Sequence, residues 1–212
     1  NMDAGTFVFE LNGVRWVVDP GNQSYYELNK IGFQLSNSKQ DSERWTLLTK
    51  NNFGHSTITV NNQLFNVKGN VSVTDFKETP LPETTLDMTE LYAGNVTSLT
   101  RKFRKESNSS LLIEDHYNIN ESTKTITWQL MTVAEVAKTD NGAVLTQDGK
   151  TLYLDVLMPT KMKMNVISLD PPPLEIDKKI KNLKRIEIEI PVSDIQNSSG
   201  KLQVRLSDVK ST

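Results

Sequence analysis

Two side chains in this sequence, Asp19 and His55, have the types and positions that suit a metal site. Asp19 ends an apolar run directly before Pro20-Gly21, and His55 lies directly ahead of another apolar run. Both are therefore expected at strand ends, where loops form the sites of β proteins. A carboxylate and an imidazole are ligands that zinc and similar divalent ions accept. The alternative is structural: Asp19 caps the turn, and His55 hydrogen-bonds to a neighbouring backbone group.

The rest of the sequence offers little reactive chemistry. It contains no cysteine, which excludes disulfides, thiol catalysis and cysteine-based metal sites. The only other histidine, His116, lies in an alternating pattern and is expected to line the face of a strand. No glycine-rich phosphate loop and no nucleophile elbow is present.

Aromatic and basic side chains raise two separate possibilities, stacking on a sugar ring and binding an anion. Tyr25-Tyr26 follows a Pro-Gly-Asn turn, so an exposed ring there could stack on a sugar. Tyr25 and Arg44 are the candidates for facing a substrate. Arg15 and the stretch Arg101–Lys105 are further basic candidates, with the alternative that the stretch is a solvated strand edge.

Charge and hydropathy exclude two classes of partner. Lys and Arg number 24 against 26 Asp and Glu, giving a net charge of -2, so the chain is not a dedicated nucleic-acid-binding protein. No apolar run approaches the roughly 20 residues that span a bilayer. The chain also begins directly with a strand-like segment, and we expect it to be cut from a longer protein.

Strands are expected to position these residues. Apolar and polar residues alternate along most of the chain, and the turns Asn12-Gly13, Asn61-Asn62 and Asp148-Gly149 favour hairpins. Trp45 to Thr49 also alternates and predicts a strand, and the only helix candidates are short, at Leu86–Leu91 and Leu174–Lys184. The fold class predicted is all-β, an antiparallel two-layer β-sandwich with a few short helices.

The core and the domain boundaries follow from the same pattern. Trp16 and Trp128 each lie within a strand pattern and are expected in the core. The Pro-bearing connector Lys77–Glu83 and the break Pro171-Pro172-Pro173 are too short to require two domains. Residues 1–212 are therefore expected to form one sandwich domain, with 174–212 as a possible appended segment.

Several motifs together carry a family resemblance. They are Asp3-Ala4-Gly5-Thr6-Phe7, Trp16-Val17-Val18-Asp19-Pro20-Gly21, Arg44-Trp45 and Gly54-His55-Ser56-Thr57-Ile58. This set resembles the heparinase II/III-like polysaccharide lyases, with specific motifs from about Asp3 to Val60. The resemblance implies the C-terminal β-sandwich of an enzyme whose N-terminal α/α toroid is not in this chain.

For the site, the resemblance implies that Asp19 and His55 match metal-binding positions, with zinc as the expected divalent ion. Many relatives have Asn after that histidine, and Ser56 stands there in this chain. The family's catalytic histidine precedes Asp3 and its catalytic tyrosine is on the toroid, so no catalytic residue is expected within this chain. The domain should form one wall of the substrate cleft and be inactive alone.

The implied reaction is β-elimination on a uronic acid of an acidic polysaccharide, such as heparin or heparan sulfate. The implied location is the periplasm or the exterior of a bacterium, and the implied partners are the polysaccharide and the chain's own toroid. Two alternatives stay open: a non-catalytic carbohydrate-binding module and a structural interaction domain.

Overall fold

Antiparallel strands form three sheets in a computed structural model of the chain, which describes residues 1–195 and 198–210. The strands are β1 (Phe9–Leu11), β2 (Val14–Val17), β3 (Ile58–Val60), β4 (Ser72–Lys77), β5 (Glu83–Asp87), β6 (Ser98–Ser107), β7 (Ser110–Asn118), β8 (Thr125–Thr132), β9 (Glu135–Thr139), β10 (Gly142–Gln147), β11 (Lys150–Met158), β12 (Lys163–Ser168), β13 (Lys184–Pro191) and β14 (Ser199–Ser207). The helices are α1 (Tyr25–Lys30) and the 3-10 turns η1 (Glu43–Thr46), η2 (Asn52–Gly54), η3 (Thr89–Tyr92) and η4 (Val192–Asp194). The predicted all-β class is confirmed.

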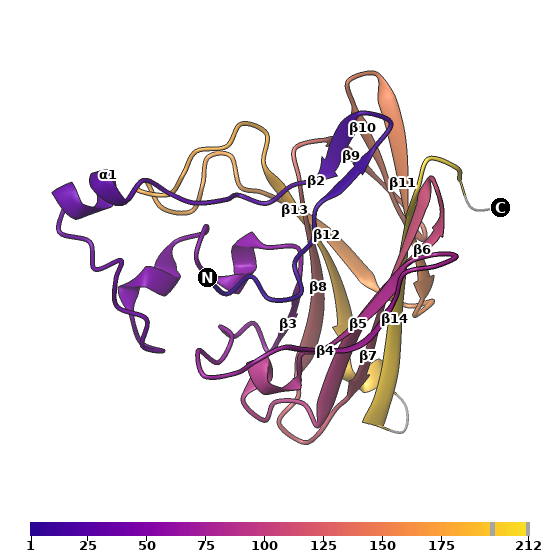
Figure 1. The fold of residues 1–212 in the computed structure, drawn as a ribbon, viewed down its shortest axis with the longest axis horizontal. Coiled ribbons are helices and arrows are strands. Elements are labelled where there is room, and N and C mark those ends of the chain that lie inside the picture. The colour runs from indigo at the N-terminus through magenta and orange to yellow at the C-terminus, as the bar shows by residue number, and fades with distance from the viewer. Residues whose placement is uncertain (196–197, 211–212) are drawn as a thin grey trace.

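Two of the sheets pack face to face as the layers of a sandwich (Figure 1). One has eight strands in the order β4-β5-β6-β7-β14-β11-β10-β9, and the other has four in the order β12-β13-β8-β3. Inward residues alternate with outward ones along each strand, so the core collects every second side chain. Trp128 of β8 and Trp16 of β2 are both in this core, as predicted.

The C-terminal strands are integral to both layers. β13 lies between β12 and β8, and β14 lies between β7 and β11. The segment from residue 174 onward therefore completes the sandwich, and the possibility that 174–212 is an appendage is wrong. Strands that are interior to a sheet have hydrogen-bonded neighbours on both sides, and removing them would divide each sheet.

An irregular segment, residues 18–57, covers the outer face of the four-stranded sheet, and we call it the N-terminal lobe. It carries α1, η1 and η2 and lies beside the connection from β12 to β13 (Figure 1). Every residue of β8 after Thr125 is buried because both faces of this strand are covered. The lobe itself has only small apolar clusters, one of which is built on Leu28, Leu35 and Leu47.

Three local predictions were wrong, and a fourth was right in part. The alternating stretch from Trp45 is not a strand, because Ser42 caps a 3-10 turn there and accepts a hydrogen bond from the Arg44 N–H. Asn61-Asn62 does form a left-handed turn, but β3 before it pairs with β8 rather than with the residues that follow. The proposed helix Leu174–Lys184 consists of turns before β13 begins. The candidate Leu86–Leu91 is the end of β5 followed by η3.

Candidate functional site

Asp19 and His55 lie side by side, although 36 positions separate them in the chain. β2 ends at Val17, and the Val18 N–H then donates to the Met131 carbonyl of β8, which fixes where Asp19 leaves the sheet. The Gly21 N–H donates to Asp19 Oδ1 at 2.8 Å and closes the turn. Asp19 Oδ2 then faces His55 Nδ1 at 2.8 Å.

The outer face of the four-stranded sheet holds the His55 segment in place. The buried Gln129 side chain donates to the carbonyls of Asn52, at 2.9 Å, and His55, at 3.3 Å. Arg185 of β13 donates to the Phe53 carbonyl at 2.8 Å. Because these bonds attach to the main chain on both sides of the imidazole, the position of His55 is set by the sheet rather than by its own loop.

The electrostatics of the pair favour an ionised carboxylate. Burial works against ionisation of Asp19, but the hydrogen bonds from His55 and from the Gly21 N–H outweigh it and hold the pKa of Asp19 below its ordinary value. The Asp19 side chain is 30% exposed, whereas that of His55 is 1% exposed. A carboxylate that accepts from Nδ1 leaves the second ring nitrogen of a neutral imidazole as an acceptor.

That second nitrogen, His55 Nε2, is buried and has no hydrogen-bond partner among the described residues. This nitrogen lies on the far side of the ring from Asp19, so the atom that could share an ion with the carboxylate is Nδ1. The donor set is short: across residues 1–195 and 198–210, no group of three His, Cys, Asp or Glu side chains could hold an ion. Asp19 Oδ2 and His55 Nδ1 are two donors, fewer than the four of a tetrahedral zinc site.

The two candidates for facing a substrate have different surroundings. Tyr25, at the start of α1, is 51% exposed, and its ring lies 5.5 Å from the Lys50 Nζ. Arg44 is half-buried, donates to the Leu35 carbonyl at 2.7 Å and lies over the Trp45 ring. Tyr25 is thus free to meet a ligand, whereas much of the Arg44 side chain supports the lobe.

The basic stretch Arg101–Lys105 forms neither a groove for anions nor an edge of a sheet. It belongs to β6, an interior strand, and its charges alternate between the two faces. Arg101 is fully buried and pairs with Asp115, while Lys102 on the opposite face pairs with Glu83 at 3.5 Å. Arg104 similarly lies 3.7 Å from Glu106.

The other predicted positions belong to exposed pairs. His116 lines a sheet face, as expected, with Nε2 at 2.9 Å from Glu114. Burial opposes ionisation of Glu114, but hydrogen bonds from Lys201, His116 and Gln203 lower its pKa to about 2. Arg15 forms an exposed pair with Glu10. The Arg15–Glu10 pair is exposed, so it contributes little to stability, and it neutralises a charge that could otherwise have attracted an anion.

Replacing Gly54, the residue before His55, by alanine is expected to destabilise the chain by about 3 kcal/mol. A Cβ at Gly54 would lie 1.8 Å from the Leu48 carbonyl oxygen, which is backbone and cannot rotate away. The variant should also shift the imidazole resonances of His55. Urea unfolding and NMR would measure both effects. The control is Gly32→Ala, where a Cβ meets nothing within 4 Å and only the left-handed φ carries a cost, about 1 kcal/mol. Equal stability of the two variants would contradict the prediction.

Comparison with known proteins supports a single family. Residues 2–167 match the family described as "Heparinase II/III-like, C-terminal". None of the curated proteins matches the chain in sequence. Within the described residues, no helix has the length and apolar character that crossing a membrane requires.

Solved structures share the fold. The heparan sulfate lyase HepC from Pedobacter heparinus superposes with a TM-score of 0.68 at 17% identity, covering 98% of this chain and 30% of that one. A structure named heparinase III gives a TM-score of 0.69 at 12% identity, covering 100% of this chain and 30% of that one. The chain thus spans about a third of the length of the solved proteins it matches. By its sequence match, with the fold in agreement, this chain belongs to the heparinase II/III-like family, in the region of that family's C-terminal domain.

Proposed function

We propose that this chain is the β-sandwich part of a lyase that cleaves an acidic polysaccharide containing uronic acid, such as heparin or heparan sulfate. The observation that carries the proposal is the pairing of the partly exposed Asp19 with the buried His55, 2.8 Å apart, at the positions where the family resemblance implies metal ligands. The similar structures are of proteins named as a heparan sulfate lyase and a heparinase, which supports this substrate class.

In the proposed reaction the proton alpha to the uronate carboxyl group is removed and the glycosidic oxygen leaves protonated, giving an unsaturated uronate. The groups that move these protons are proposed to lie outside this chain, on the toroid and just ahead of Asp3. Within the chain, the turn at Asp19 and the segment at His55 form one wall of the cleft. We propose that the chain is inactive when separated from the rest of the protein.

Asp19 and His55 would hold a divalent ion, zinc in the proposal, with the remaining ligands from outside the chain. The ion would supply a structural crosslink between the turn that begins at Asp19 and the loop that precedes β3. Asp19 would contribute a carboxylate that stays ionised because its pKa is lowered, and His55 would contribute the Nδ1 that faces Asp19 Oδ2 at 2.8 Å, with the ion in the place of the shared proton. A substrate outside the cell also implies a periplasmic or secreted protein, which we include in the proposal.

A second candidate is a non-catalytic carbohydrate-binding module. The observation in its favour is the exposure of two adjacent rings on α1, Tyr25 at 51% and Tyr26 at 66%. Rings that are held out on a short helix can stack on sugars without any cleavage chemistry.

An assay of depolymerisation tests the proposal. The chain and the complete protein that contains it would be incubated with heparan sulfate, chondroitin sulfate and alginate, following the ultraviolet absorbance of unsaturated uronate. Only the complete protein is expected to form product, and the polymer it cleaves identifies the substrate. If neither protein forms product on any of the three polymers, the lyase proposal is wrong. Binding without cleavage would then favour the carbohydrate-binding module.

A further inference from the structure

Lys50 is a buried cation without an anion. It is 1% exposed, and its Nζ donates to the side-chain oxygen of Asn22 at 2.9 Å. The Lys50 Nζ also lies over the face of the Tyr25 ring, 5.5 Å from the ring centroid. Among the described residues, no carboxylate lies within 4.0 Å of this ammonium. A lysine in a polar turn has no pattern that sets it apart, so the sequence did not identify it.

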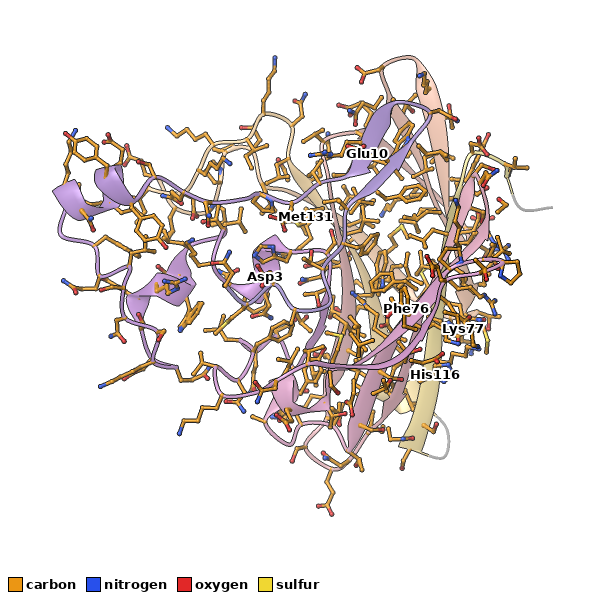
Figure 2. The ribbon with its side chains drawn as sticks, viewed as in Figure 1. Asp3, Glu10, Phe76, Lys77, His116 and Met131 are labelled. Carbon is orange, nitrogen blue, oxygen red and sulfur yellow. The ribbon has the colours of Figure 1, made fainter. Side chains whose placement is uncertain are left out.

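This environment is unfavourable for an ammonium. The group has three N–H donors, and the described residues provide one acceptor. Burial lowers the pKa of Lys50, and attraction to Tyr25 only partly offsets it. The positive charge of Arg44 lowers this pKa further, and Asp3, which is labelled in Figure 2, opposes that last effect. Buried charges in proteins are normally paired, because leaving the charge uncompensated costs several kcal/mol. An incoming oxyanion would supply both the charge and the missing acceptors.

Lys50 also lies beside the candidate site. The residue that accepts its hydrogen bond, Asn22, belongs to the turn that begins at Asp19, and a second lysine, Lys178, donates to the Pro20 carbonyl of the same turn at 2.7 Å. Tyr25 and Asn22 are both on the outer surface of the N-terminal lobe, with Tyr25 half exposed. The cover over the ammonium therefore consists of an aromatic ring and an amide, which are side chains that suit contact with a sugar.

We infer that Lys50 is a binding site for one anionic group, a carboxylate or a sulfate, of an acidic polysaccharide, with the Tyr25 ring packing against the sugar. The inference rests on the proposed substrate class. When the anionic group binds, the side chains of Tyr25 and Asn22 move aside, and the oxyanion replaces the side-chain oxygen of Asn22 as acceptor. The ammonium thereby gains charge-assisted hydrogen bonds.

The decisive variant is Lys50→Met, which preserves the shape of the side chain and removes its charge. Because the buried ammonium is uncompensated, the variant should unfold at the same urea concentration as the wild type or at a higher one. Its Kd for a heparan sulfate hexasaccharide, measured on the complete protein by titration calorimetry, should rise at least about tenfold. Lys184→Met is the matched control, since Lys184 is also largely buried but donates to the Ala134 carbonyl on another part of the sheet. Its Kd should stay at the wild-type value.

Two chemically modified probes identify the anionic group. If Lys50 binds the carboxylate, a hexasaccharide with reduced carboxyl groups should bind the wild type and Lys50→Met with equal affinity. If Lys50 binds the sulfate, a desulfated hexasaccharide should bind the two proteins with equal affinity. Unchanged affinity of Lys50→Met overturns the inference, and so does a joint loss of affinity and stability that Lys50→Arg fails to rescue. A wild type that binds no acidic hexasaccharide also overturns it. Binding that depends on Lys50 but yields no unsaturated product supports the inference and overturns the proposed lyase function.

Discussion

Replacing Arg101 by methionine is expected to lower the free energy of unfolding by about 3–5 kcal/mol. Arg101 and Asp115 are both fully buried and form a bidentate pair, with Nε at 2.7 Å and Nη2 at 2.9 Å from the carboxylate oxygens. The variant leaves a carboxylate in the core with no cation. It also removes the Nη1 donor that bonds the carbonyls of Gly5 and Ser56, so the N-terminal turn at Gly5 and the His55 segment lose a shared attachment.

Urea unfolding of the wild type and three variants would measure this effect. The double variant Arg101→Met/Asp115→Leu should recover part of the loss, because it removes both buried charges and leaves neither unpaired. Lys102→Met is the control on the same strand, where the pair with Glu83 is partly exposed and the change should be within about 0.5 kcal/mol. A loss of less than 1 kcal/mol for Arg101→Met would show that water or a rearranged side chain compensates Asp115.

The second large effect is expected at the candidate metal pair. In the complete protein, His55→Ala should lower the affinity for zinc by more than about 100-fold, and Asp19→Asn by about 10–100-fold. The alanine variant removes the nitrogen ligand, whereas the asparagine variant keeps that nitrogen and replaces the carboxylate ligand by a neutral amide. Lyase activity should fall in the same order if the ion holds the two loops of the cleft together.

Elemental analysis after dialysis against a competing chelator would measure zinc directly, independently of activity. His116→Ala is the matched control, because the chain's other histidine lies on an exposed sheet face beside Glu114. It should retain the zinc content of the wild type. If the wild type holds no zinc, or if His55→Ala holds as much as the wild type, the assignment of His55 as a ligand is wrong.

Local turn chemistry made the hairpins of the fold predictable. Asn12-Gly13 and Asp148-Gly149 both adopt positive φ, and each joins two strands that pair as expected. The strand order was not predictable in this way. β14 is placed between β7 and β11 by inward side chains that match across the sheet, and sequence alternation does not specify a neighbour.

The candidate site was predictable in part for a related reason. Asp19 and His55 stand out because a strand end next to a reactive side chain is visible in the sequence, and the structure brings the two together. Gln129, which holds the His55 segment from β8, is one polar residue within an apolar run. Its function depends on the N-terminal lobe packing over that face of the sheet, and no local pattern reports such packing.

The difference in packing between the sandwich and the N-terminal lobe should appear in the rates at which their amides exchange with solvent. The lobe has few strand ladders of its own and small apolar clusters, so its amides should exchange with solvent through openings that leave the sandwich intact. Asp19, Lys50 and His55 all belong to this less stable unit. A ligand that bridges them would therefore slow hydrogen exchange across residues 18–57, while the slowest amides of the two sheets continue to report global unfolding.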